Sequence, residues 1–341
     1  MLADMASNRA GRAVTIHTVA ERAGVHASTV SRALRRDPAG APAAVRRIHA
    51  LAEELGYRPT LAGASLRTGQ SHAVGVLVHR LTDVVQAMTF EAIDRAAVEA
   101  GYQAMVATTE DDPERQRRRA DLLLSRGVDG LIVADAHLDG GYADWLASRG
   151  VPVVLVIRGL PGHVSVTVDD RLAGRLVGGH LADLGHRNVA VLAGLAWSSA
   201  STERAAGAVA ALRDRGVGPG DDLVVPCGLD VTSGHTAMAR LLDEHPDLTA
   251  VFAVNDFMAL GAMIALREHG LEPGRDVAVV GYNDVDIAPA AELTTVRCPH
   301  DQMGSIALRQ LLDLVQGRSA HSIRLSPELV VRASSGPPRT G

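Results

Sequence analysis

From residue 71 onward the chain alternates between short apolar runs and longer amphipathic stretches, and this alternation restricts its fold more than any other feature. Strands that alternate with helices build parallel sheets with helices on both faces. We expect the apolar runs to be buried strands, at 73–78, 103–107, 129–134, 152–157, 189–193, 250–254 and 277–281. We expect the helices between them to stop at glycines, namely Gly101, Gly127, Gly150, Gly185, Gly216 and Gly270.

Residues 71–335 are too many for one such sheet, so the pattern predicts two doubly wound α/β lobes. Ligands of open α/β sheets bind outside the carboxyl ends of the strands, which here means between the lobes. No apolar run reaches the roughly 18 residues of a membrane span, and the first twelve residues hold no signal-peptide core. We therefore expect a cytoplasmic protein that does not associate with membranes.

Two short helices around a glycine are predicted near the N-terminus. Apolar residues recur with helical spacing from Ile16 to Ala23, Gly24 then ends the first helix, and a second helix carries Val30 and Leu34 inward. A third amphipathic helix is expected over 42–55. This is the plan of a helix-turn-helix, whose second helix enters the major groove of DNA. The side chains expected to point outward from that helix are Ala27, Ser28, Ser31 and Arg32.

The charged residues are distributed unevenly between the N-terminal segment and the rest of the chain. The whole chain carries a formal charge of −5, but residues 1–70 hold ten arginines and five acids while the remainder holds 24 arginines and 34 acids. A basic head on an acidic body favours a nucleic-acid-binding module. Every basic residue is arginine, which excludes lysine chemistry, and the two cysteines Cys227 and Cys298 form no CxxC motif. We expect no metal site, no cofactor and no catalytic residues.

The head resembles the lactose-repressor (LacI-type) family of bacterial transcription regulators. The matching motifs run from Val19-Ala20 through Ala23-Gly24-Val25 and Thr29-Val30-Ser31-Arg32 to Leu55-Gly56-Tyr57-Arg58-Pro59 and Ser65-Leu66-Arg67-Thr68-Gly69. The resemblance implies a DNA-binding domain over 13–58 and a hinge over 59–70 that folds into a helix on DNA. The family usually has serine before the recognition helix, where this chain has His26, a poorer cap.

The resemblance and the predicted outward face together place the DNA contacts. Leu66 is expected to insert as an apolar wedge into the minor groove and bend the duplex, and Arg32 to read guanine. The full set of expected DNA-binding residues is Thr15, Ala27, Ser28, Thr29, Ser31, Arg32, Arg35, Tyr57 and Leu66. Because the family binds DNA as a symmetric dimer, the operator is expected to be nearly palindromic.

The resemblance extends over the body and implies a periplasmic-binding-protein-like core over 71–335 for effector binding and dimerisation. Lobe 1 is expected at about 71–168 and 299–326, and lobe 2 at about 169–298 and 327–335. Arg204 stands where the family has its pocket arginine, whose fork suits vicinal hydroxyls, a ring oxygen or an anion. The expected effector-binding residues are Asp83, Arg158, Arg204, Asn255, Tyr282 and Asn283. Trp197 and Phe257 are open as further contacts or plain packing.

These observations predict a ligand-responsive transcription regulator, in the first place a repressor, with a sugar or sugar derivative as effector. The chain ends soon after Ser335 without a heptad repeat, which favours a homodimer over a tetramer. One alternative is a solute-binding protein for carbohydrate uptake, which would leave the basic head unexplained. Another is a sugar-active enzyme using Asp169 and Asp170, although adjacent carboxylates at a helix start more often serve as cap and dipole partner.

Overall fold

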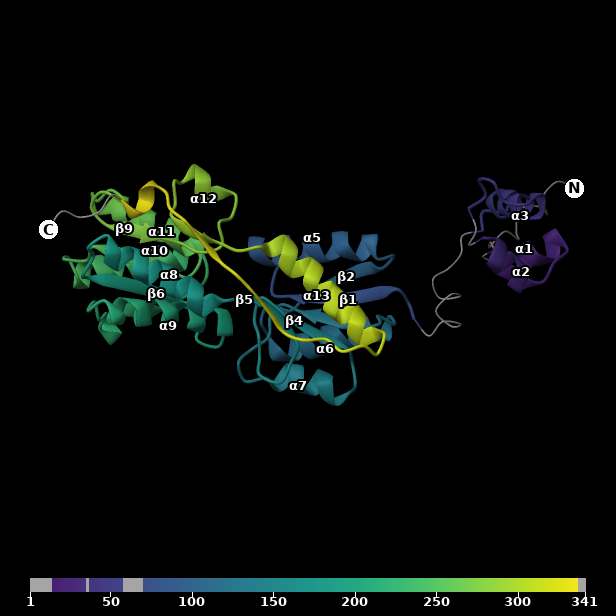
Figure 1. Ribbon diagram of the computed structural model, residues 1–341, viewed down its shortest axis with the longest axis horizontal. Helices are drawn as coiled ribbons and strands as arrows, with labels where there is room; N and C mark the ends of the chain where they lie inside the picture. Colours follow the sequence, from purple (N-terminus) through teal and green to yellow (C-terminus); the bar gives the residue numbers. More distant parts are fainter. Residues whose placement is uncertain (1–13, 35–36, 58–69, 337–341) are drawn as a thin grey trace, which may run out of the picture. The chain divides into compact units, whose positions relative to one another are not determined.

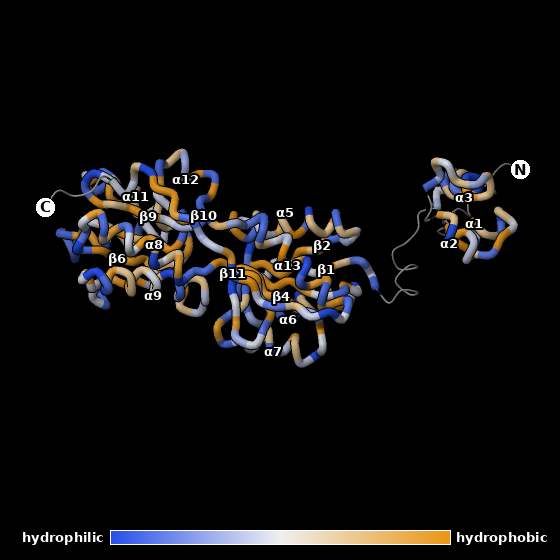
Figure 2. The backbone as a smooth tube through the Cα atoms, in the orientation of Figure 1, coloured by the Kyte–Doolittle hydropathy of each residue, from blue (hydrophilic) through white to orange (hydrophobic). Residues whose placement is uncertain are grey.

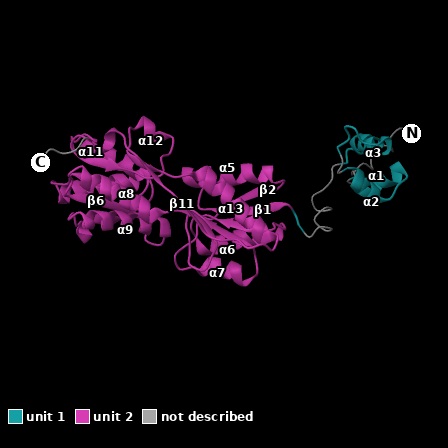
Figure 3. Cartoon of the chain, in the orientation of Figure 1, with its two compact units in different colours: residues 1–71 teal, residues 72–341 magenta. Residues whose placement is uncertain are grey.

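The computed structural model describes residues 14–34, 37–57 and 70–336. The chain forms two compact units, of which the first ends at Ser71 and the second begins at His72 (Figure 3). The predicted residues Arg35 and Leu66, and all of the predicted hinge except Gln70, lie outside the described residues.

The first unit is a bundle of three helices, α1 (Ile16–Ala23), α2 (Ala27–Ala33) and α3 (Ala43–Glu54). Each helix contributes two buried residues to a shared core: Val19, Ala20, Val30, Ala33, Ile48 and Ala52. The apolar spacing in the sequence therefore predicted the helices and most of the core. Leu34, predicted inward, is only partly buried at the end of α2, and Ala33 takes the buried place.

The second unit contains two lobes. One of them, which we call lobe 1, is built on a six-stranded sheet in the order β11-β5-β4-β3-β1-β2 with every pair parallel. The strands are β1 (Ala73–Val78), β2 (Gln103–Thr108), β3 (Leu131–Val133), β4 (Val153–Val156), β5 (Ser165–Val168) and β11 (Ile323–Leu325). Helices α5 (Val84–Glu99) and α13 (His300–Val315) pack together on this sheet, as do α6 (Pro113–Ser125) and α7 (Gly141–Ser148) (Figure 1).

The other half, lobe 2, has a four-stranded parallel sheet in the order β7-β6-β8-β9. Its strands are β6 (Val189–Gly194), β7 (Val224–Pro226), β8 (Ala250–Ala253) and β9 (Ala278–Val280). Its helices form two packed pairs, α8 (Asp170–Asp183) with α9 (Ser199–Asp214) and α10 (Val231–Glu244) with α11 (Asp256–Glu268), and the short α12 (Ile287–Ala290) follows β9. In Figure 2 hydrophobic residues concentrate along the strands inside both lobes.

The chain passes between the two sheets three times. It leaves lobe 1 after β5, returns before α13, and crosses again between β11 and β12 (Glu328–Val330). At the crossings β12 pairs with β10 (Thr295–Arg297) in a short antiparallel ladder. A 3-10 turn over Ala333–Ser335 then packs against β9 in lobe 2.

The predicted alternation is confirmed for all seven apolar runs and for the six helix-ending glycines, each of which has a positive φ. The sequence pattern missed β5, β7, β10, β11 and β12. β5 and β11 alternate apolar with polar residues, and β10 and β12 each include charged or polar residues, so none of these four strands is a continuous apolar run. Among the described residues, no helix is long and apolar enough to cross a membrane.

Glycines set the spacing of α8 and α9. A Cβ on Gly174 would lie 2.0 Å from the Arg204 carbonyl oxygen, and one on Gly207 would lie 2.2 Å from the Arg171 carbonyl oxygen. The backbones of the two helices therefore approach more closely than side chains would allow. This approach brings the first turn of α8 next to Arg204, which decides the geometry of the site below.

Candidate functional site

The turn between α1 and α2 has the geometry that the sequence predicted. Gly24 adopts a left-handed conformation with φ of 67°, and its N–H reaches the carbonyls of Ala20 and Glu21. Thr15 caps α1, with its side chain and that of Thr18 bonding each other's backbone N–H in a capping box. His26 makes no side-chain bond as the cap of α2, as its residue type predicted.

The exposed face of α2 carries part of the expected DNA contacts. Ser28 and Arg32 are exposed, whereas Thr29 and Ser31 are half-buried. Ala27 was predicted to point outward, and this is wrong in part: its small side chain is half-buried and packs against the core of the bundle. Tyr57 also packs against that core, and Thr15 is exposed at the start of α1.

In lobe 2 the structure brings Arg204 and Tyr282 together around a residue that the sequence analysis set aside, Asp170. The Arg204 Nε donates to Asp170 Oδ1 at 2.7 Å, and its Nη1 donates to the Val254 carbonyl at 3.0 Å. The Tyr282 hydroxyl donates to the same Asp170 oxygen at 2.6 Å. The guanidinium lies 3.5 Å from the centroid of the Tyr282 ring. The cap is Asp169, which accepts the Leu172 N–H, so Asp170 is free to pair with Arg204.

Burial dominates the electrostatics of this cluster. It raises the pKa of the Tyr282 hydroxyl well above its usual range, and it raises the pKa of Cys298 to about 12. His300, at the start of α13, is 5% exposed, and neither ring nitrogen forms a good hydrogen bond. Burial, followed by the nearby Arg204 charge, lowers the pKa of His300 to about 4. His300 is therefore neutral at pH 7.

Lobe 1 holds a second charged cluster, where Asp111 is surrounded by three cationic or titratable groups. Arg158 Nη1 lies 2.9 Å from Asp111 Oδ1, His79 Nδ1 lies 2.9 Å from Oδ2, and His137 Nε2 lies 3.7 Å from Oδ1. Burial alone would raise the pKa of Asp111, but the His79 hydrogen bond and the Arg158 charge lower it below its usual range. Three of these residues follow the carboxyl ends of β1, β3 and β4, and Asp111 follows β2.

A loop of lobe 2 reaches this cluster. The Trp197 indole stacks on the His137 ring with centroids 4.2 Å apart, and the Arg158 guanidinium lies 4.8 Å from the indole centroid. Two hydrogen bonds flank the stack: Leu138 N–H donates to the Trp197 carbonyl at 3.0 Å, and Gly159 N–H donates to Ser199 Oγ at 3.1 Å. Residues 197–199, which we call the strap, therefore tie the two lobes together. Trp197 thus makes a contact between the lobes, and a role in effector binding stays a prediction.

The remaining expected effector residues have local backbone partners. Asp83 caps α5 by accepting the Val85 and Gln86 N–H groups, and Asn255 caps α11 by accepting those of Phe257 and Met258. Asn283 is buried with φ of 121°, and its N–H donates to the Val296 carbonyl. The six expected residues thus do not form one cluster. Arg204 and Tyr282 share a cluster, Arg158 belongs to another, and Asp83 and Asn255 hold helix ends.

Sequence reasoning missed Asp111, His79, His137 and His300, and it considered Asp170 only as a catalytic candidate or a helix-start acid. Their common signal was position, because each of them follows the end of a strand by one to four residues or begins the next helix. A buried carboxylate with a free oxygen, Asp135, follows β3 in the same way: its Oδ2 accepts from Gln116 at 3.1 Å, while Oδ1 has no partner among the described residues.

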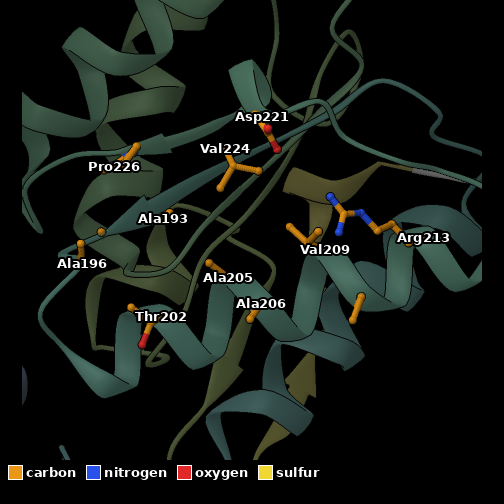
Figure 4. A pocket seen from close by; sticks show the side chains of 12 residues that line it. Ala193, Ala196, Thr202, Ala205, Ala206, Val209, Arg213, Asp221, Val224 and Pro226 are labelled. Atoms are coloured by element: carbon orange, nitrogen blue, oxygen red, sulfur yellow. The ribbon is translucent and has the colours of Figure 1, made fainter. Parts of the chain in front are cut away.

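An apolar cavity of about 550 Å³ lies elsewhere on lobe 2, between α9 and the edge strand β7 (Figure 4). Small side chains such as Ala193, Ala205 and Val209 form its wall, and Arg213 and Asp221 stand at its rim. None of the six expected effector residues lines it. Its chemistry does not match the charged clusters above, so we do not assign the effector to it.

The fold and the paired clusters at facing strand ends define a DNA-binding head joined to a two-lobed ligand-binding core. Family models agree: residues 71–329 match the periplasmic binding proteins and sugar binding domain of the LacI family, and residues 15–60 match the bacterial regulatory proteins of the lacI family. The chain therefore belongs to the LacI family of bacterial regulatory proteins.

Individual relatives are similar over nearly the whole chain. The HTH-type transcriptional regulator CelR of Thermobifida fusca is 35% identical over 336 residues, which is 95% of this chain and 98% of CelR. The lac repressor dimer bound to operator and the anti-inducer ONPF superimposes with a TM-score of 0.86 at 29% identity, over 95% of this chain and 99% of that chain. The CelR–cellobiose complex gives 0.72 at 31% identity, over 94% and 99%.

Proposed function

We propose that this chain is a cytoplasmic transcription repressor that binds a nearly palindromic operator as a homodimer and responds to an uncharged sugar. In this proposal residues 13–58 bind DNA, residues 59–70 form the hinge, and residues 71–335 bind the effector and dimerise. The support is the family membership, together with a solved relative described as a dimer on its operator. Regulation is the activity we propose, with no catalytic step.

The exposed side chains of α2 support the DNA-binding role. Ser28 and Arg32 stand free of the bundle core on the helix that enters the major groove in this motif. The test is selection from a random DNA library with the full-length protein, followed by titration of the selected duplex. We expect a two-fold symmetric site bound by two chains. Selection of no common sequence, or of an asymmetric site bound by one chain, would contradict the proposal.

The uncharged nature of the effector rests on one observation: each buried arginine between the lobes already has a carboxylate of its own. Arg158 pairs with Asp111 and Arg204 with Asp170, so the site has no surplus positive charge for an anionic ligand. The Arg204 Nη2 group is still able to donate to hydroxyls. A solved relative is described with cellobiose, an uncharged sugar, bound.

The effector test is a thermal-shift screen of the full-length protein. The panel pairs neutral mono- and disaccharides with their phosphorylated counterparts. A second experiment then titrates the operator with and without the ligand that stabilises the protein most. A ligand at 100 times its Kd stabilises the folded protein by about 2.7 kcal/mol. We expect a neutral sugar to stabilise the protein and to change operator affinity. Stabilisation by a phosphorylated sugar alone would reject the uncharged effector and leave the regulator intact.

A further inference from the structure

A second pocket lies beside the strap and is separate from the expected effector residues. It has a volume of about 370 Å³, within the range of small-molecule sites. Lobe 1 supplies its β4–β5 loop and the neighbouring strands, including Ser165 and Thr167 of β5 and Arg324 of β11. Lobe 2 supplies Asp170, Ser199 and Glu203 from the starts of α8 and α9. The pocket therefore exists only while the lobes keep this arrangement.

The lining is rich in hydroxyls and its charges are compensated. Hydroxyl groups come from Ser165, Thr167, Ser199 and Ser322. Glu203 lies 3.9 Å from Arg324 across the lobe boundary, and Asp170 is held by Arg204. A wall of hydroxyls with paired charges matches a ligand that both donates and accepts hydrogen bonds and carries no net charge.

Asp170 connects this pocket to the Arg204 cluster. The residue lines the pocket, and its Oδ1 accepts from both Arg204 Nε and the Tyr282 hydroxyl. Arg158, Arg204 and Tyr282 themselves do not line it. A ligand in the pocket would thus lie beside the residue that positions Arg204, and it would bias the arrangement of the lobes without contacting Arg158, Arg204 or Tyr282.

We propose that this pocket, at the boundary of the lobes beside the strap, is a second binding site for a small uncharged polyol, coupled to operator binding. The inference rests on the proposed regulator function, because coupling acts through the lobes. Binding at a wall shared by both lobes favours the arrangement that forms the wall, and the coupling is reciprocal. A polyol here therefore shifts the affinity for operator DNA, and operator DNA shifts the affinity for the polyol by the same factor.

The test uses a filled pocket and a matched control in the full-length protein. Leu138 lines the pocket and is 45% exposed, so Leu138→Trp adds bulk at its mouth with little effect on the core. Leu122, on α6, is 47% exposed and lies outside the pocket, so Leu122→Trp is the control. Isothermal titration with glycerol, erythritol, ribitol and D-glucose measures binding, and inorganic phosphate serves as the anionic probe.

We expect at least one neutral polyol to bind the wild type and Leu122→Trp with equal affinity, and to bind Leu138→Trp at least tenfold more weakly. Phosphate should bind none of the three proteins. Glu203→Gln, which breaks the ion pair with Arg324, should weaken the same polyol if Leu138→Trp does not fold. Equal affinity for both tryptophan variants, or no polyol binding at all, overturns the second site. If the wild-type protein binds no operator, the proposed function is contradicted instead. Failure of the second site and failure of the proposed function are therefore distinguishable.

Discussion

Arg204 is a buried ion-pair partner as well as an expected effector contact. Its side chain is 10% exposed and that of Asp170 is 5% exposed, so each charge depends on the other for compensation. Removing one member of a buried pair leaves an unpaired charge, whereas replacing both with apolar residues is often tolerated. A loss of effector response in an Arg204 variant therefore has to be separated from a loss of stability.

The first prediction concerns this pair. Arg204→Met should lower the free energy of unfolding by about 3–5 kcal/mol, because Asp170 stays buried without its cation. Arg204→Met combined with Asp170→Leu should recover at least half of that loss. Urea unfolding of the three proteins, followed by circular dichroism, measures both effects. An Arg204→Met variant as stable as wild type would show that the pair is not closed in solution.

The second prediction concerns acid stability. His300 has a pKa of about 4 in the folded protein, below its ordinary value of 6.5. Between these values the unfolded chain binds the proton and the folded chain does not, so this stability is present above pH 6.5 and is lost as the pH falls toward 4. From pH 7 to 5 the wild type should lose about 2 kcal/mol more than His300→Gln.

Urea unfolding of wild type and His300→Gln at both pH values measures that difference. Buried carboxylates such as Asp135 and Asp256, whose pKa values burial raises, respond in the opposite direction. They are common to both proteins and cancel in the comparison. Parallel pH profiles for the two proteins would mean that His300 titrates freely in the folded state.

At this scale the sequence predicted Arg204 and Tyr282 but not their partner. Asp170 follows Asp169, and two adjacent acids at a helix start look alike in sequence. Only the close approach of α8 and α9 distinguishes the cap from the residue that pairs with Arg204. Asp111 and His137 were missed for a related reason, because residues far apart in the chain meet only when parallel strands end at one edge.

Among the elements, α2 is where operator recognition can be tested. Arg32 is exposed on α2, and arginine is able to bind two acceptors of guanine. Arg32→Ala should weaken binding to the selected operator by about 1–3 kcal/mol with little change on random DNA. Fluorescence anisotropy with both duplexes at several salt concentrations measures this. An equal loss on both, with a shallower salt dependence, would mean that Arg32 contacts phosphate only.

The packing of α8 on α9 gives a prediction with an internal control. Gly174→Ala would place a methyl group 2.0 Å from the Arg204 carbonyl oxygen, which belongs to the backbone and cannot turn away. We expect a loss of about 1–3 kcal/mol or more. Gly179→Ala, in the same helix, meets the flexible end of Arg215 at 3.0 Å and should be tolerated. Thermal unfolding of both variants tests the pair, and equal melting temperatures would contradict the close approach.

Element prediction succeeded where the sequence repeats a pattern and failed where a strand is not a continuous apolar run. Apolar runs and terminal glycines predicted the main strands and helices, since burial and left-handed φ select those residues. β11 pairs with β5 at the edge of the lobe 1 sheet, and β12 pairs with β10 at the crossings, so their partners rather than their own composition define these strands. The end of α2 shows the same limit, because neighbouring helices decide whether Ala33 or Leu34 is buried.

For the whole molecule, the strap is a contact between the lobes whose effect on them can be tested. Trp197→Ala removes the stack on His137 and the Arg158 contact, so the flanking amides of Leu138 and Gly159 should open more often. Hydrogen–deuterium exchange with mass spectrometry should show faster exchange in the peptide containing Gly159. Trp145→Ala is the control, since Trp145 contacts Tyr142 and Arg149 within lobe 1. Unchanged exchange at Gly159 would show that the strap does not hold the lobes.

The distribution of charge also acts over the whole chain. The basic residues 1–70 carry the DNA-binding bundle, and the acidic remainder carries the two lobes. Like charge repels the lobes from the phosphate backbone, which keeps DNA contact on the head. The charge distribution along the sequence therefore predicts nucleic-acid binding by the head, although the net charge of the whole chain is negative.

The three crossings between the sheets have a mechanical consequence. Two lobes joined by a single connecting segment can rotate relative to each other in any direction, but each further connection restricts that rotation. With three connections, two of which carry strands paired as β10 and β12, we expect the relative motion of the lobes to be restricted mainly to bending in one direction. Ligands of different chemistry would then all shift the lobes by the same bending motion. Residues that line a pocket can then change in evolution to bind new ligands, while the conformational change between the lobes stays the same.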